Sequence, residues 1–330
     1  MAIDQIEMIN GKASYASLRV PAYHKLGTVF QNEVTTSEML SLANLDNWNV
    51  RLEDIQLPEG YTSVKNNFMV VRDHPSDNHG DVLSMVGERY KVLQNEELFS
   101  FGDALLDGGR WEVAGSLKQG RIVFGALALE RETVLDPNGV SDVIKNYLAI
   151  STSHDGSSAV QATVTPIRLT CMNTHTAVFR KGAKHSFKLR HTQSLDGRVA
   201  TAREALGLAN TYIDEFEKMA REMIETEINK TKFNEMVALA YPMPDKDTKG
   251  AMTKWSNKVD LLDEIYTGDT NGMIAGTAWG AYNALTERLD WFRTARGNGE
   301  GILMGTAGFD PVVNAEKNKL LSIVREVAGV

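Results

Sequence analysis

Two apolar, β-branched runs that meet at Asp155-Gly156 constrain the fold of this chain more than any other feature. Both residues of the Asp-Gly pair tolerate positive φ, so the pair is a strong signal for a tight turn between two antiparallel strands. The segment that begins at Asn146 therefore predicts a β-hairpin. It continues into a basic tail that ends near His191.

The order of elements before this hairpin indicates the fold class. Residues 95–107 place apolar side chains at helical spacing, with Asn95 as the N-cap. Two strand-like runs follow at 110–118 and 121–131. A helix followed by antiparallel strands with short turns is typical of an α+β domain, because a doubly wound sheet would alternate its strands with helices. We predict an α+β fold in which a helix packs on an antiparallel β-sheet with a long β-hairpin, followed by a helical C-terminal part.

The region upstream of residue 95 contains further strand signals. Apolar alternation predicts strands at 48–57, 61–73 and 82–93. The polar stretch between the last two reads as a hairpin loop, in which we expect His74 and His79 to be isolated and solvated. Residues 1–45 are predicted to be irregular, apart from a short helix near their end.

From about Val199 the apolar period becomes helical. The first helical run is broken at Tyr241-Pro242, and later helices are predicted at 255–266, 273–294 and 314–327. We therefore expect an α+β core with the basic segment at 1–195 and a helical region at 196–330.

Composition limits the setting in which the protein works. Cys171 is the single cysteine, which excludes an internal disulfide framework and fits a reducing cytosol. No run approaches the roughly 20 apolar residues that span a bilayer. The N-terminal residues lack the cationic start and apolar core of a signal peptide. These features predict a cytoplasmic protein without a membrane partner.

The charge distribution is strongly polarised. No acidic residue lies between Asp155 and Asp196, and this stretch carries six Lys or Arg residues, so the remainder of the −8 chain carries −14. An anionic partner is the simplest reason for such a segment. Cations that follow a phosphate backbone, together with an aromatic side chain that stacks on unpaired bases, suit single-strand binding. The predicted phosphate contacts are Arg168, Arg180, Lys181, Lys184, Lys188 and Arg190, with Phe187 as the stacking platform. The segment could instead be a solvated loop, or could dock on the acidic helices of a neighbouring subunit.

No compact catalytic pattern emerges from the sequence. Gly297, Gly299 and Gly301 follow a predicted helix, whereas a phosphate-binding loop leaves a strand and opens a helix. The stretch from Ser153 to Ser157 contains serine-triad residue types, but neighbours on a tight turn point in different directions, so we interpret it as a polar turn. We therefore predict a non-enzymatic protein without a bound cofactor.

The sequence contains no compact metal-binding or acid-base pattern. Cys171 and His175, followed by His185 and His191, have spacings that match no compact zinc pattern. Glu287 and Asp290 share one helix face at i,i+3, and such pairs are usually solvent-facing charge. We predict no metal site. A divalent metal that raised thermal stability would revive the hydrolase or nuclease class.

Five separated blocks resemble one family over nearly the whole chain. They are H-K-L-G-T at His24 to Thr28, Y-K-V-L-Q-N-E at Tyr90 to Glu96, S-H-D-G-S at Ser153 to Ser157, R-L-T-C-M-N-T at Arg168 to Thr174 and G-T-A-W-G-A-Y-N-A-L-T-E at Gly276 to Glu287. Together they look like the phage/plasmid-like proteins known as domain of unknown function 932. One departure is Asp290-Trp291, where the family pattern carries an Asp-His pair. The resemblance implies that the protein originates from a mobile genetic element. It does not imply a particular reaction.

A weaker similarity is to the phage and eukaryotic single-strand annealing recombinases, whose core has a similar order of elements. This similarity is an analogy of fold. It implies a ring or filament that grips the sugar-phosphate chain without ATP. Our leading hypothesis is thus a phage-type, ATP-independent protein that binds single-stranded DNA and anneals or protects it as a homo-oligomer. The second hypothesis is a self-assembling or host-interacting structural protein without affinity for nucleic acid.

Overall fold

The fold is described from a computed structural model that covers residues 7–19, 27–55, 57–60, 64–106, 110–136, 139–168, 173–174, 186–191, 197–245, 248–292 and 311–330. The strands are β1 (Met8–Ile9), β2 (Lys12–Ala13), β3 (Tyr15–Leu18), β4 (Thr28–Phe30), β5 (Arg51–Asp54), β6 (Asn67–Asp73), β7 (Gly80–Gly87), β8 (Arg110–Leu117), β9 (Ile122–Leu135), β10 (Asp142–Ser153), β11 (Val160–Arg168), β12 (Asn173–Thr174) and β13 (Ser186–Leu189). The helices are α1 (Thr36–Leu42), α2 (Asn95–Leu106), α3 (Val199–Glu225), α4 (Lys230–Ala240), α5 (Lys249–Thr267), the 3-10 helix η2 (Gly272–Ile274), α6 (Ala278–Trp291) and α8 (Pro311–Ala328).

The main sheet confirms the predicted α+β class. Its strand order is β12-β11-β10-β9-β8-β3-β4, and β13 also pairs with β11. The pairs are antiparallel except for β3 with β4. β9 and β10 form the long hairpin, and the predicted hairpin at Asp155-Gly156 joins β10 to β11. Gly156 has φ +70°, a conformation that glycine adopts without steric cost.

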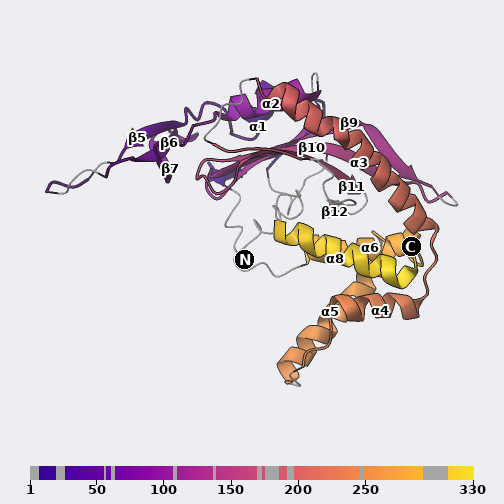
Figure 1. The fold of residues 1–330 in the computed structure, drawn as a ribbon. Helices are drawn as coiled ribbons and strands as arrows, with labels where there is room; N and C mark the ends of the chain where they lie inside the picture. Colours follow the sequence, from indigo (N-terminus) through magenta and orange to yellow (C-terminus); the bar gives the residue numbers. More distant parts are fainter. Residues whose placement is uncertain are drawn as a thin grey trace.

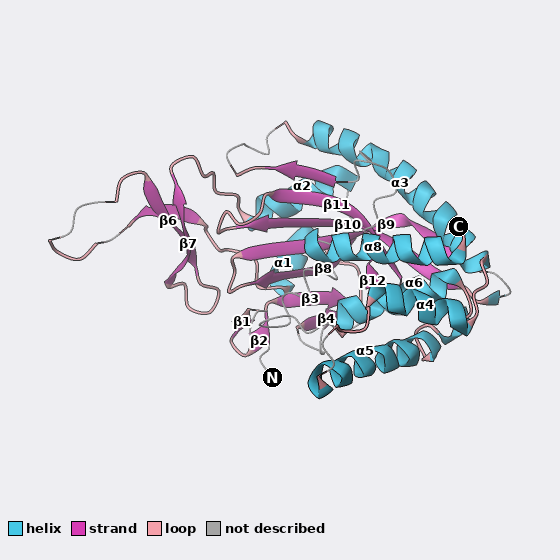
Figure 2. Cartoon of the chain, turned by 60° about the horizontal axis from the view of Figure 1, so that its bottom comes forward, coloured by secondary structure: helices cyan, strands magenta, loops and turns pink. Residues whose placement is uncertain are grey.

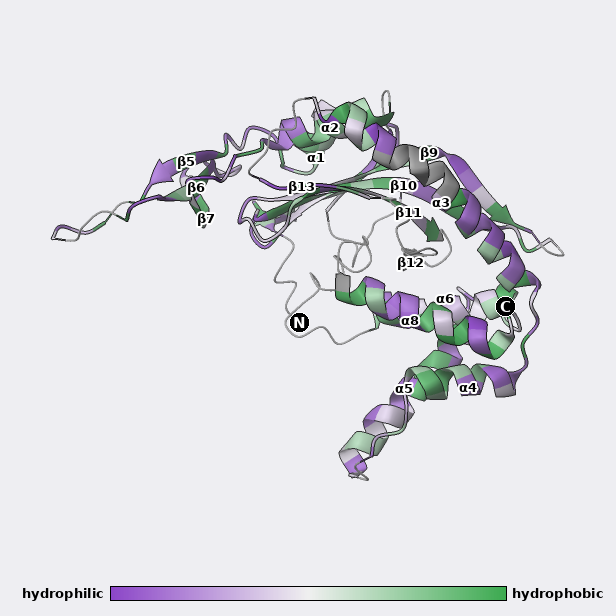
Figure 3. Ribbon diagram, in the orientation of Figure 1, coloured by the Kyte–Doolittle hydropathy of each residue, from purple (hydrophilic) through white to green (hydrophobic). Residues whose placement is uncertain are grey.

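Helices cover both faces of the main sheet (Figure 1). α1, α2 and α3 lie on one face, where Leu98 and Phe99 of α2 join Trp111 and Ile150 in the first buried apolar cluster. α6 and α8 lie on the other side of the sheet, and α4 and α5 extend beyond them. The second buried cluster joins the C-terminal half of α3 to α4, α5, α6 and α8. In Figure 3, α5 alternates between hydrophilic and hydrophobic segments, as expected for a helix with one buried face.

A smaller sheet of β5, β6 and β7 projects to one side of the main sheet (Figure 2). Its strands match the three predicted upstream strands in order. Ser84 of β7 ties it to the end of β10, since its hydroxyl donates a 2.8 Å hydrogen bond to the carbonyl oxygen of His154.

The N-terminal region differs from the prediction of irregular structure. β3 pairs with β8 and β4 extends the sheet beside β3, so two short N-terminal strands complete the main sheet. These strands have only four and three residues, too few for a clear alternating pattern. The short helix was predicted correctly. In α1, Thr35 and Glu38 form a reciprocal capping box. Within the described part of the chain, no helix has the length and apolar character needed to cross a membrane.

Candidate nucleic-acid interface

β13 places part of the predicted basic segment at the edge of the main sheet. In its antiparallel pairing with β11, Phe187 lies opposite Ala162 and Lys188 lies opposite Gln161. Phe187 and Leu189 are buried, whereas Lys188 and the following Arg190 are exposed. This alternation is expected of a strand with one face on the core and one in water. The sheet edge therefore presents these two cations to solvent.

Phe187 does not have the predicted stacking role in this structure. Its side chain is 8% exposed and belongs to the first buried cluster. Its ring centroid lies 5.8 Å from that of Phe101 in α2. A ring held in the core is not available to stack on a base, so the structure assigns Phe187 to packing instead.

The other predicted contacts lie in different places. Arg168 is the last residue of β11, in register with Ile144 of β10 and Asn173 of β12. Arg180, Lys181 and Lys184 lie outside the described residues. The structure therefore places Lys188 and Arg190 at the end of one strand. The phosphate contacts predicted for all six cations stay a prediction.

The structure adds cations that the sequence alone did not connect to β13. The backbone N–H of Lys91 donates a 2.5 Å hydrogen bond to the carbonyl oxygen of His191, directly after Arg190. The ring of Tyr90 stacks on that of His191 with 4.9 Å between centroids. Arg89 and Lys91 flank Tyr90 and are both exposed. The loop that precedes α2 thus adds two cations beside the end of β13.

The turn between β8 and β9 lies at the same end of the sheet as the last residues of β13. Ile122 at the start of β9 pairs with both Leu117 of β8 and Ser153 of β10. The backbone N–H of His154 donates a 2.7 Å hydrogen bond to the carbonyl oxygen of Arg121. We call the exposed cations gathered at this end the basic sheet end; they are Arg89, Lys91, Lys118, Arg121, Lys188 and Arg190.

The basic sheet end differs electrostatically from the other charged surface of the sheet. Among described residues, Arg89, Lys91, Lys188 and Arg190 form no ion pair. By contrast, three of the four cations that line a cleft of about 570 Å³ over β8, β9 and β10 are paired with carboxylates. The pairs are Lys145 with Glu112, Arg110 with Glu33, and Arg131 with Asp214 and Glu217. Unmatched cations attract an anionic ligand more strongly than paired ones do.

His154 lies beneath the basic sheet end and is fully buried. Its Nε2 lies 3.0 Å from Oδ1 of Asn95, whose Nδ2 donates to the carbonyl oxygen of Leu45. Burial, together with the nearby His191 and Arg72, lowers the pKa of His154 to about 3. Burial also lowers the pKa of His191. Both histidines are therefore neutral structural groups at pH 7.

The remaining residues of the polar turn have separate partners. The hydroxyl of Ser153 donates to the carbonyl oxygen of Ser158, and the Asp155 carboxylate accepts from the backbone N–H of Ser157. With the ring of His154 on Asn95, these side chains do not converge as nucleophile, base and orienting acid.

Glu287 and Asp290 are buried, which contradicts their interpretation as solvent-facing charge. The Glu287 carboxylate accepts hydrogen bonds from Thr270 and Asn271 at 2.8–2.9 Å. Asp290 lies 2.7 Å from Nζ of Lys317 in α8, and both side chains are 0% exposed. These acids hold α6 to its neighbours in the second buried cluster.

The remaining sequence candidates concern glycines, Cys171 and other histidines. Gly297, Gly299 and Gly301 lie outside the described residues, as do Cys171, His175 and His185. His191 is buried against Tyr90 instead of facing solvent.

The fold and the basic sheet end define an α+β protein with an exposed cationic sheet edge. The chain belongs to the family described as Domain of unknown function (DUF932), whose model matches residues 82–305. This confirms the family resemblance drawn from the sequence. No curated protein and no solved structure matches the chain. The similarity to single-strand annealing recombinases therefore stays a prediction.

Proposed function

We propose that the protein is an ATP-independent, single-stranded-DNA-binding protein that anneals or protects DNA strands in the cytoplasm. The observation that carries the proposal is the basic sheet end, where exposed cations from β13, the loop before α2 and the β8–β9 turn lie together. Binding to a phosphate backbone releases condensed counterions, which drives association without nucleotide hydrolysis. Because Phe187 is buried, phosphate contacts rather than base stacking on this ring supply the affinity.

The charge distribution supports a homo-oligomer, a ring or a filament, as part of the same proposal. A +6 stretch and a −14 remainder on one chain favour head-to-tail contacts between copies. Such an array places successive basic sheet ends along one strand. The bases stay free to pair with a complementary strand because the contacts are made to the backbone.

Replacing Lys188 and Arg190 together by Ala should weaken binding to labelled single-stranded DNA and reduce its salt dependence. Each lost phosphate contact lowers the slope of log K against log salt by about 0.7, so the double variant should lose about 1.4. Both side chains are exposed, so the fold should be retained. Fluorescence anisotropy across a salt series, with single-stranded and duplex oligonucleotides, measures the slopes.

The matched control replaces Lys249 and Lys254 together by Ala. Both lysines are exposed on α5, which lies away from β13. This double variant removes the same charge and should leave the slope unchanged. An equal loss in both variants would show that only net charge matters. Negligible binding of the unaltered protein at low salt would remove the proposal and favour the self-assembling or host-interacting protein.

A further inference from the structure

The turn between β6 and β7 brings two histidines side by side. The backbone N–H of His74 donates a 2.9 Å hydrogen bond to the carbonyl oxygen of His79, directly beyond the paired Asp73 and Gly80. Asn78 adopts φ +58°, which lets the chain turn back in four residues. The two imidazole rings stack with 4.7 Å between centroids and 18° between planes. The expectation that these histidines are isolated is therefore wrong.

The turn residues between them fix both rings. The Nδ1 of His79 is hydrogen-bonded to Oδ1 of Asp77, and the backbone N–H of His79 donates to the same oxygen. The Nδ1 of His74 lies 2.7 Å from the hydroxyl of Ser76 and accepts from its backbone N–H. A ligand atom from each of His74, Asp77 and His79 lies within 4.8 Å of the other two.

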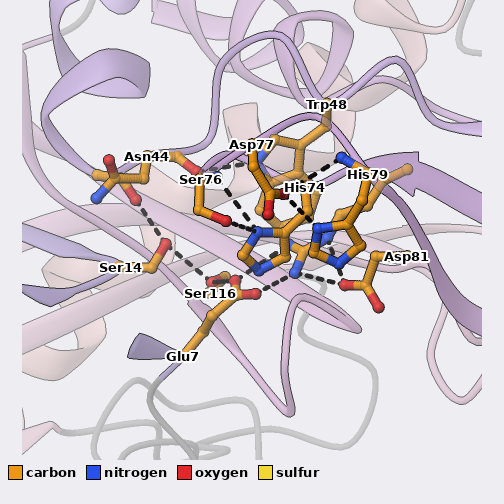
Figure 4. A network of polar contacts seen from close by, with 12 residues as sticks. Glu7, Ser14, Asn44, Trp48, His74, Ser76, Asp77, His79, Asp81 and Ser116 are labelled. Atoms are coloured by element: carbon orange, nitrogen blue, oxygen red, sulfur yellow. Dashed lines mark hydrogen bonds and ion pairs between the residues drawn. The ribbon is translucent and has the colours of Figure 1, made fainter. Parts of the chain in front are cut away.

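Two more carboxylates lie near His74 (Figure 4): Asp81 belongs to β7 of the same hairpin, and Glu7 belongs to the N-terminal segment. Glu7, Asp81 and His74 also have ligand atoms within 4.8 Å of one another. The buried guanidinium of Arg72 donates to Glu7 at 3.1 Å and to Asp81 at 2.9 Å, and the hydroxyl of Ser116 donates to Glu7 at 2.6 Å. These contacts hold the two carboxylates in place beside the histidine pair.

The charges of this cluster favour a cation. Glu7, Asp77 and Asp81 carry three negative charges, and Arg72 supplies one positive charge among them. With neutral imidazoles, the cluster carries −2. Glu7 is buried, so its charge is screened less by water than that of a surface carboxylate.

We propose that His74, Asp77 and His79 bind one divalent transition-metal ion of the Zn²⁺ class. Two imidazoles select such an ion over Mg²⁺ or Ca²⁺, which prefer oxygen ligands alone. Three protein ligands leave a fourth position for water, because zinc is usually four-coordinate. With Zn–N distances of about 2.0–2.1 Å, tetrahedral ligand atoms lie roughly 3.4 Å apart, so side chains whose ligand atoms lie within 4.8 Å of one another must rotate to converge on one ion. Asp81 and Glu7 do not ligate the ion in this proposal; their negative charges lie beside the site and favour binding of the cation.

Isothermal titration of the full-length, chelator-treated protein with Zn²⁺ tests the proposal. We expect one saturable site per chain, and at least a tenfold weaker affinity in the variants His74→Gln, His79→Gln and Asp77→Asn. Titration with Co²⁺ should give the visible absorption of a low-symmetry site, and His79→Gln should abolish it. Zn²⁺ should also raise the melting temperature of the unaltered protein, since it binds the folded state.

A matched control separates this site from scattered surface binding. Asp245→Asn removes an exposed carboxylate elsewhere on the protein and should bind Zn²⁺ with unchanged affinity. Circular dichroism of each variant checks that the fold is retained. Absence of saturable binding, or an affinity of the His74→Gln and His79→Gln variants equal to that of the unaltered protein, would overturn the proposal.

The metal site and the nucleic-acid interface rest on different observations. Fluorescence anisotropy in the presence of EDTA or Zn²⁺ measures whether the ion affects DNA binding. The zinc titration contains no DNA, so its outcome does not depend on the proposed function.

Discussion

Replacing Lys317 by Met should lower the free energy of unfolding by about 3–5 kcal/mol. Nζ of Lys317 lies 2.7 Å from Asp290 across the contact between α8 and α6, and neither side chain reaches water. Removal of the ammonium leaves the carboxylate of Asp290 buried without its cation. That carboxylate must then stay charged at a large desolvation cost or take up a proton.

Urea unfolding followed by circular dichroism measures this loss. Lys319→Met is the matched control, because Lys319 is exposed on the same helix. It should change stability by less than about 0.5 kcal/mol. The double variant Lys317→Met with Asp290→Leu should recover most of the loss, since a buried ion pair can often be replaced by apolar side chains at little cost. A small effect of Lys317→Met alone would contradict the buried pair.

Acidification should destabilise the protein through His154. The pKa of His154 is about 3 in the folded protein and about 6.5 in an unfolded chain, so between these values the unfolded state binds more protons. The stability is therefore complete above pH 6.5 and falls as the pH drops toward 3. This one group should cost about 1.4 kcal/mol for each pH unit in that window.

Unfolding midpoints in urea between pH 7 and pH 4.5 measure the effect. His154→Gln should lower stability at pH 7, because the ring packs 5.7 Å from Trp48 and is hydrogen-bonded to Asn95. It should also flatten the decline between pH 6.5 and pH 4.5, because Gln does not titrate. A variant with the same pH slope as the unaltered protein would show that other groups cause the decline. The lowered pKa of His191 acts in the same direction, so some slope should remain.

The local signals in the sequence predicted most of the sheet and the helices. The hairpin at Asp155-Gly156 and the helix over 95–107 depend on neighbouring residues, and the structure contains both. The predicted role of Asn95 as the N-cap is wrong, because Asn95 is already the first residue of α2 and its buried side chain is hydrogen-bonded to Leu45 and His154. The place of β3 was missed because a four-residue strand takes its position from β8, far along the chain. Pairing between strands so far apart in the chain produces no local sequence pattern from which the position of β3 could be predicted.

For the candidate sites too, the sequence predicts what neighbouring residues determine and misses what depends on residues far along the chain. The alternation of Ser186 to Leu189 contained enough information to predict that Phe187 is buried when Lys188 is exposed, because side chains alternate along a strand. The pairing of His74 with His79 was also within reach, since residues that flank a hairpin turn are cross-strand neighbours. The burial of Asp290 was not, because its partner Lys317 lies on another helix. Nor could the sequence alone place Lys91 beside His191.

The pairing of β3 with β8 also has a consequence for how the chain acquires its structure. Tyr15 lies opposite Gly115, so strands made near the start of synthesis must wait for partners made one hundred residues later. Contacts between such distant residues carry a larger closure entropy than hairpins and form slowly. Until β3 arrives, the outer side of β8 is an unpaired strand edge, which can pair with the same edge of another nascent chain. Aggregation during expression should therefore depend on the integrity of residues 15–30 more than on any part of the helical region.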